Sequence, residues 1–110
     1  VVHFEIIGKD GKKLHDFYGG VFGWKIDANN PMNYGLVEAQ GSGIGGGVGQ
    51  GEGPSATFYI EVDDPQAYLN KIESMGGKTI VPVTVIPGMV TFAQFADPEG
   101  NVIGIVKSEG

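Results

Sequence analysis

The period of apolar and polar positions changes several times along the first half of the chain. Residues 1–7, VVHFEII, are rich in β-branched and aromatic side chains, which predicts a short strand with His3 and Glu5 on one face. Apolar residues then recur at helical spacing over residues 11–22, which predicts a helix. Three further strands are expected, at residues 24–28, 34–39 and within 44–48, with a turn at 29–31.

The second half shows the same order of patterns. A strand is predicted at residues 57–62, TFYIEV. Asp64 followed by Pro65 is typical of a helix start, and Gly76 with Gly77 is typical of a helix end. Three strands follow, at residues 78–86, 90–96 and 101–106. Each half is therefore predicted to contain a strand, a helix and three strands.

The two halves also match residue by residue. At an offset of 54 residues Phe4 aligns with Phe58 and Ile6 with Ile60, whereas the last strands match best at an offset of 58, which aligns Gly46 with Gly104. The chain is predicted to be one α+β domain over residues 1–110. It consists of two tandem βαβββ units, residues 1–50 and residues 55–110.

Composition and charge narrow the possible functions. The chain has 110 residues, of which 41% are hydrophobic and 18% charged, as in a globular domain. It contains no cysteine, which excludes a disulfide framework, a thiolate zinc site and a cysteine nucleophile. The net charge is −6 and the basic residues are scattered singly, so no nucleic-acid partner is expected. An acidic surface would favour a cationic small molecule, but a mildly acidic soluble protein with no such preference is the default interpretation.

Neither a targeting segment nor a nucleotide-binding loop is predicted. The sequence has no apolar run of membrane-spanning length and no signal-peptide pattern, so a cytoplasmic location and no membrane contact are expected by default. The stretch GSGIGGGVGQGEG, Gly41–Gly53, contains G-x-G-x-x-G. No helix follows it to receive a phosphate, and we interpret it as a strand followed by a flexible connection.

Three motifs identify a family resemblance. They are His3-Phe4-Glu5-Ile6, the helix residues Phe17-Tyr18 followed by Val21-Phe22-Gly23-Trp24, and the turn Phe95-Ala96-Asp97-Pro98-Glu99-Gly100-Asn101. Together with the repeated unit they resemble the vicinal oxygen chelate superfamily, which includes glyoxalase I, bleomycin resistance proteins and extradiol dioxygenases. The resemblance implies that the two units pair into a cup-shaped mixed sheet that holds a ligand, and that the protein is a homodimer.

The resemblance also implies where a metal would be bound. Metal-dependent members carry ligands on the first and last strand of each unit, and these positions correspond to His3, Gly46, Thr57 and Gly104. A divalent metal needs several converging nitrogen or oxygen donors, and glycine has no side chain. No metal cofactor is therefore predicted. An alternative site using Glu5, Glu38 or Glu61 stays open, although a two-residue step along a strand moves a donor by roughly 6 to 7 Å.

Several of these side chains have two interpretations. His3 could act as an acid or base, or it could be a hydrogen-bonded structural residue. Glu5 and Glu61 could form a carboxylate pair or lie at the sheet rim in water. Tyr59 belongs to a set of aromatic residues that could line a pocket or fill the core, and His15 is expected to be solvated.

Two functions are consistent with these features. The first is a metal-free small-molecule-binding protein of the bleomycin resistance type. The alternative is a metal-dependent lyase, isomerase or dioxygenase of the same superfamily, with a divalent metal as cofactor. The predicted ligand-binding residues are His3, Glu5, Gly46, Thr57, Tyr59 and Gly104.

Overall fold

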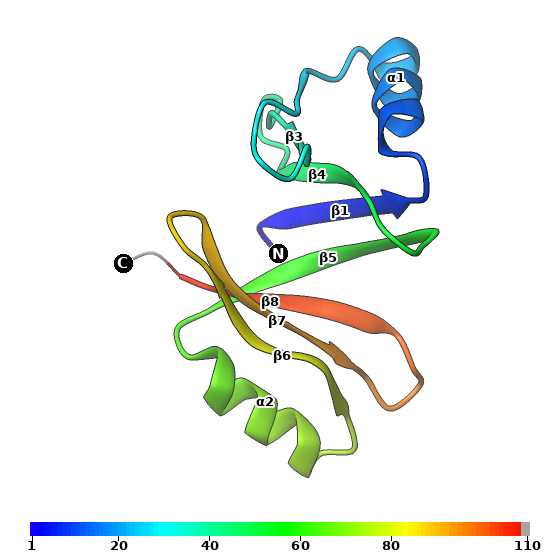
Figure 1. Cartoon of the computed structure of the whole chain (residues 1–110). Helices are drawn as coiled ribbons and strands as arrows, with labels where there is room; N and C mark the ends of the chain where they lie inside the picture. Colours follow the sequence, from blue (N-terminus) through cyan, green and yellow to red (C-terminus); the bar gives the residue numbers. More distant parts are fainter. Residues whose placement is uncertain (109–110) are drawn as a thin grey trace. The chain divides into compact units, whose positions relative to one another are not determined.

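The protein folds into two compact units, each built from the predicted order of elements (Figure 1). The computed structural model describes residues 1–108. Contacts between Cα atoms divide the chain into a first unit of residues 2–57 and a second unit that begins at Phe58. Within the described residues each unit has a strand, a helix and three strands in that order, which confirms the predicted α+β class.

The first unit is a mixed sheet with one helix. Its elements are β1 (His3–Gly8), α1 (Gly11–Phe22), β2 (Ile26–Asp27), β3 (Gly35–Val37) and β4 (Gly45–Gln50). The strand order is β2-β3-β4-β1, in which β1 runs parallel to β4 and the other neighbours are antiparallel. Strand β4 therefore lies between two hydrogen-bonded neighbours, so its backbone has little freedom to shift.

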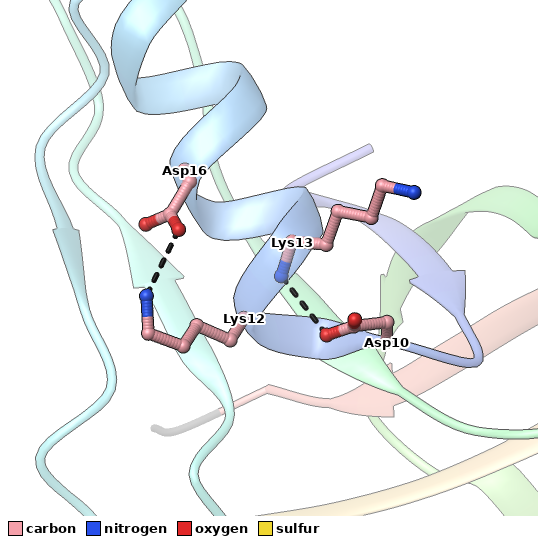
Figure 2. A network of polar contacts seen from close by, with 4 residues as sticks. All are labelled: Asp10, Lys12, Lys13 and Asp16. Atoms are coloured by element: carbon pink, nitrogen blue, oxygen red, sulfur yellow. Dashed lines mark hydrogen bonds and ion pairs between the residues drawn. The ribbon is translucent and has the colours of Figure 1, made fainter.

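Helix α1 begins and ends where its sequence predicts. The Asp10 carboxylate caps the N-terminus by accepting a hydrogen bond of 3.1 Å from the backbone N–H of Lys13, as Figure 2 shows. Gly23 ends the helix in the left-handed conformation with φ of 70°. The ion pair between Lys12 and Asp16, 2.9 Å long, is exposed and contributes little to stability because water screens it.

One face of β1 packs against aromatic residues from the end of α1. The rings of Phe4 and Trp24 lie 5.4 Å apart, and Trp24 stacks on Tyr18 at 5.1 Å. Contacts of this kind add to the hydrophobic burial of the rings. Because side chains alternate along a strand, His3 and Glu5 extend from the opposite face of β1.

The second unit repeats this architecture. Its elements are β5 (Ser55–Val62), whose first three residues precede the boundary at Phe58, α2 (Pro65–Ser74), β6 (Lys78–Ile86), β7 (Val90–Ala96) and β8 (Val102–Lys107). The strand order is β5-β8-β7-β6, with β5 parallel to β8 and the other pairs antiparallel. Its core is formed by the buried side chains of Val62, Leu69, Ala93 and Ile105.

In the second unit two aspartate carboxylates accept backbone hydrogen bonds, one at the start of α2 and one in the turn before β8. The Asp64 carboxylate accepts a hydrogen bond from the backbone N–H of Ala67 at the start of α2, as predicted. In the turn before β8 the Asp97 carboxylate accepts from the side chain of Asn101 and from the backbone N–H groups of Asn101 and Glu99. These hydrogen bonds lower the pKa of Asp97, with the Asn101 side chain as the largest cause.

The repeat alignment of the last strands needs a correction of one residue. In the first unit Glu5 is paired with Gly47, and in the second unit its equivalent, Tyr59, is paired with Gly104. Gly104 therefore corresponds to Gly47, at an offset of 57 residues, and the predicted offset of 58 is wrong. In a run of glycines the sequence offers no side-chain pattern that could distinguish the two registers.

Candidate functional site

A tyrosine hydroxyl joins the two polar residues on one face of β1. The Tyr34 hydroxyl donates a hydrogen bond of 2.9 Å to a carboxylate oxygen of Glu5. The Nε2 atom of His3 lies 3.1 Å from the same hydroxyl oxygen. A hydroxyl has one proton and Tyr34 donates it to Glu5, so the His3 Nε2–H must be the donor to Tyr34. We call these three residues the polar cluster.

The glycines of β4 make room for the tyrosine. A Cβ atom at Gly47 would overlap the hydroxyl and ring of Tyr34, and a Cβ at Gly49 would lie 2.9 Å from its Cδ1 atom. The ring therefore lies directly on the backbone of β4. Gly47 is paired with Glu5 on β1 and with Leu36 on β3, so the strand cannot move aside to admit a larger residue. This is the structural role of part of the glycine run.

The loop before β3 holds the tyrosine in place. The side-chain oxygen of Asn30 accepts hydrogen bonds from the backbone N–H groups of Met32 and Tyr34, at 3.2 and 3.0 Å. Its side-chain nitrogen donates to the carbonyl of Tyr34 at 2.7 Å. Three hydrogen bonds from one side chain fix the backbone of the loop, and Asn33 adopts a φ of 52° within it. Tyr34 thus enters the sheet from an ordered turn.

The electrostatics of the polar cluster favour an uncharged histidine. Burial is the larger influence and lowers the pKa of His3, whereas the neighbouring Glu5 carboxylate acts in the opposite direction. The rings of His3 and Tyr34 are nearly parallel, with an angle of 19° and centroids 6.3 Å apart. A neutral imidazole that donates through Nε2 places its proton on the Tyr34 side.

The second unit contains the same combination of a tyrosine and a glycine. A Cβ atom at Gly104 would overlap the ring of Tyr59, which comes from the paired position on β5. The Tyr59 hydroxyl accepts a hydrogen bond of 2.8 Å from Gln94, and its ring meets Phe92 edge to face at 6.4 Å. In each unit a tyrosine ring therefore covers a glycine of the strand parallel to the unit's first strand.

The structure places the predicted site residues in three groups. His3 and Glu5 come together through Tyr34, and Tyr59 and Gly104 share one face of the second sheet. Thr57 precedes Tyr59 by two residues on β5 and so lies on that face. A Cβ at Gly46 would instead overlap the ring of Phe4, so Gly46 belongs to the opposite face of β4 from His3 and Glu5.

Two features of the first unit were missed by sequence reasoning. Tyr34 was expected only as a strand residue, and the available signal was a tyrosine that follows an Asn-Asn-Pro turn and precedes a glycine-rich strand. The expectation that His15 is solvated is wrong. It is half-buried, and its Nε2–H donates to the carbonyl of Val48 at 2.6 Å, which joins α1 to β4.

The residues at the implied metal positions do not fit a divalent ion. In the first unit the β4 residue on the face of His3 and Glu5 is Gly47, and the space above it is filled by the phenol of Tyr34. The phenol donates its proton to Glu5 and so carries no charge to offer a metal, which makes it a poor substitute for a carboxylate ligand. Among residues 1–108, His, Asp and Glu side chains nowhere gather in a group of three that could hold a metal ion.

Comparison with known proteins establishes the family. A model of the Glyoxalase/Bleomycin resistance protein/Dioxygenase superfamily matches residues 1–105. The chain belongs to this superfamily, which confirms the resemblance seen in the motifs. None of the helices within residues 1–108 is both long and apolar enough to span a membrane.

Relatives differ in how much of their length the chain covers. A glyoxylase-like domain-containing protein from Didymella fabae is 30% identical over 96% of this chain and 91% of its own length. The putative glyoxylase CFP32 from Mycobacterium bovis is 28% identical over 87% of this chain, which spans only 41% of that relative. A superfamily member from Vibrio splendidus, 14% identical with 98% of each chain covered, has the same fold with a TM-score of 0.67.

Proposed function

We propose that this protein binds a small organic molecule through the polar cluster of its first unit and does so without a metal. The observation that carries the proposal is the single hydroxyl of Tyr34, which is hydrogen-bonded to both His3 and Glu5. Membership of the superfamily supports the binding of a small molecule in general. The donor set at the implied metal positions supports binding by the protein's own side chains.

The three residues have different roles in this proposal. Glu5 provides the negative charge and the acceptor oxygens for the ligand. Tyr34 orients the Glu5 carboxylate and adds an aromatic face, since its ring is held flat on Gly47 and Gly49. His3 holds the Tyr34 hydroxyl in turn, which limits the rotamers available to all three side chains before a ligand arrives. Order of this kind reduces the entropy lost on binding.

A compound screen under metal-free conditions tests the proposal. A library of small polar and aromatic compounds is applied to protein treated with a chelator, and the shift in melting temperature is recorded. Compounds that stabilise the wild type should stabilise Tyr34→Phe less. Tyr68→Phe, which alters an exposed tyrosine on α2, is the matched control and should respond like the wild type. Hits that appear only after addition of a divalent metal would support the metal-dependent alternative and contradict the proposal.

A further inference from the structure

An open groove lies along strands β2 and β3, at the edge of the first unit's sheet. It has a volume of about 440 Å³ and is lined by residues 25–27 and 36–38. Sites for small ligands have volumes of roughly 300 to 1,000 Å³, so the groove is large enough for one. We propose that it is a second binding site, separate from the polar cluster, for a small zwitterion. The preferred class is an α-amino acid with an apolar side chain.

The strand register brings two opposite charges to one end of the groove. Ile26 is paired with Val37, and the backbone N–H of Glu38 donates to the carbonyl of Lys25 at 3.2 Å, so Lys25 lies opposite Glu38. Because side chains alternate along a strand, Lys25 and Glu38 extend from the face opposite to that of Val37, which is buried. The Cβ atoms of directly opposed residues are roughly 4.5 to 5.5 Å apart. An amine and a carboxylate therefore face the same part of the groove.

These two charges have little to give up when a ligand binds. Both residues are exposed, and among residues 1–108 the side chains of Lys25 and Glu38 take part in no ion pair or hydrogen bond. A direct pair between two exposed side chains would in any case be weak. The Lys25 amine can donate to a ligand carboxylate, and the Glu38 carboxylate can accept from a ligand ammonium. One molecule that carries both groups can satisfy the two side chains together.

The rest of the groove favours an apolar side chain on the ligand and an excess of positive charge at its polar end. Leu36 lies on the same face as Glu38, two residues or roughly 6 to 7 Å along the strand, and is 43% exposed. Covering this leucine with an apolar group is favourable. Asp27 is paired with Leu36, and its carboxylate accepts a hydrogen bond of 2.8 Å from the backbone N–H of Asn29, which orients it. Two carboxylates and one amine in the groove should favour an ammonium over a carboxylate when a ligand has only one of them.

Three probes with the same apolar group test which charges the groove recognises. Leucine carries both charged groups, 3-methylbutylamine carries only the ammonium, and 4-methylpentanoate carries only the carboxylate. Each is titrated into ¹⁵N-labelled protein at constant ionic strength while the backbone amide signals are followed. Leucine is expected to shift the amides of residues 25–27 and 36–38 in a saturable way. Its Kd should be about threefold or more below that of the amine, and the acid should bind most weakly.

Conservative variants assign each half of the ligand to a side chain. Lys25→Gln should weaken leucine binding by a factor of about three to ten and leave binding of the amine nearly unchanged, because only the ligand carboxylate loses its partner. Glu38→Gln should weaken binding of both leucine and the amine by a similar factor, since the ammonium loses an acceptor. The controls Lys71→Gln and Glu99→Gln make the same chemical changes at exposed positions of the second unit and should bind leucine as the wild type does.

The outcomes separate this site from the one in the proposed function. Strand β3 lies two strands from β1, roughly 10 Å away, so Tyr34→Phe is expected to leave leucine binding unchanged. Loss of leucine binding in Tyr34→Phe would assign the ligand to the polar cluster and overturn the second site. No saturable shift with leucine, equal affinities for leucine and the amine, or unaltered leucine binding in Lys25→Gln would also overturn it. The proposed function would still be decided by the metal-free compound screen.

Discussion

Substitution of Gly47 by alanine should displace the Tyr34 ring from its position on the backbone of β4. The added Cβ would overlap the Tyr34 hydroxyl and ring, far inside the ordinary contact distance of about 3.5 to 4 Å. Strand β4 is paired on both sides, so the ring rather than the backbone must move. Two hydrogen bonds would be lost, at about 1 kcal/mol each, together with an overpacking cost of about 1 to 3 kcal/mol. The expected loss of stability is therefore about 3 to 5 kcal/mol.

The energetic coupling between Gly47 and Tyr34 is measured by chemical denaturation of four proteins. The free energy of unfolding is determined for the wild type, Gly47→Ala, Tyr34→Ala and the double variant. In the Tyr34→Ala background the obstructing ring is gone, so Gly47→Ala should cost little or even stabilise the strand. Gly20→Ala is the matched control, because a Cβ at Gly20 in α1 meets no atom within 4 Å. That change should stabilise the protein by up to about 1 kcal/mol.

Two results of these measurements would contradict the contact between Tyr34 and Gly47. Equal stability of Gly47→Ala and the wild type, with unchanged signals from the His3 ring, would refute the seating of Tyr34 on Gly47. If the changes in the free energy of unfolding caused by Gly47→Ala and Tyr34→Ala were additive in the double variant, the cost of Gly47→Ala would arise from contacts other than the Tyr34 ring.

Three further predictions concern other contacts. Gly104→Ala should displace Tyr59 from Gln94 and destabilise the protein by about 2 to 4 kcal/mol in urea titrations, and an unchanged midpoint would contradict this. His15→Ala should cost about 1 to 2 kcal/mol in the same assay, because the Val48 carbonyl loses its donor, whereas a solvated His15 would cost nothing. Burial lowers the pKa of folded His3 below the unfolded value of about 6.5, so just below pH 6.5 the unfolded chain binds more protons than the folded chain. Stability should therefore rise as the pH approaches about 6.5 from below, and this part of the rise should be smaller in His3→Gln.

Much of the fold could be predicted because local and tertiary preferences agree in most elements. Helix α1 and strands β6 and β7 have the predicted bounds, and α2 begins at Pro65 after its Asp64 cap. Strands β2 and β3 are shorter than predicted. At the start of β3 the side chain of Asn30 forms hydrogen bonds with the backbone N–H and C=O of Tyr34, which keeps this residue out of the sheet. Such side-chain competition with the strand ladder is not visible in the apolar pattern.

The candidate site could be predicted only in part, because it depends on register and on one loop residue. The alternation of side chains along the first strand was enough to place His3 and Glu5 on one face. It could not reveal that Tyr34, twenty-nine residues after Glu5, fills the space above β4. Nor could it decide between Gly46 and Gly47 within a run of glycines, where a slip of one residue exchanges the two faces of the strand.

The metal content of the purified, untagged protein decides whether the first unit holds a metal ion. Elemental analysis determines zinc, nickel, manganese and iron per chain, before and after incubation with each metal and removal of the excess. We expect far less than one ion per chain in every case, because Gly47 and Tyr34 lie where a carboxylate ligand would be needed. One tightly held ion per chain, lost when His3 is replaced by alanine, would contradict this expectation.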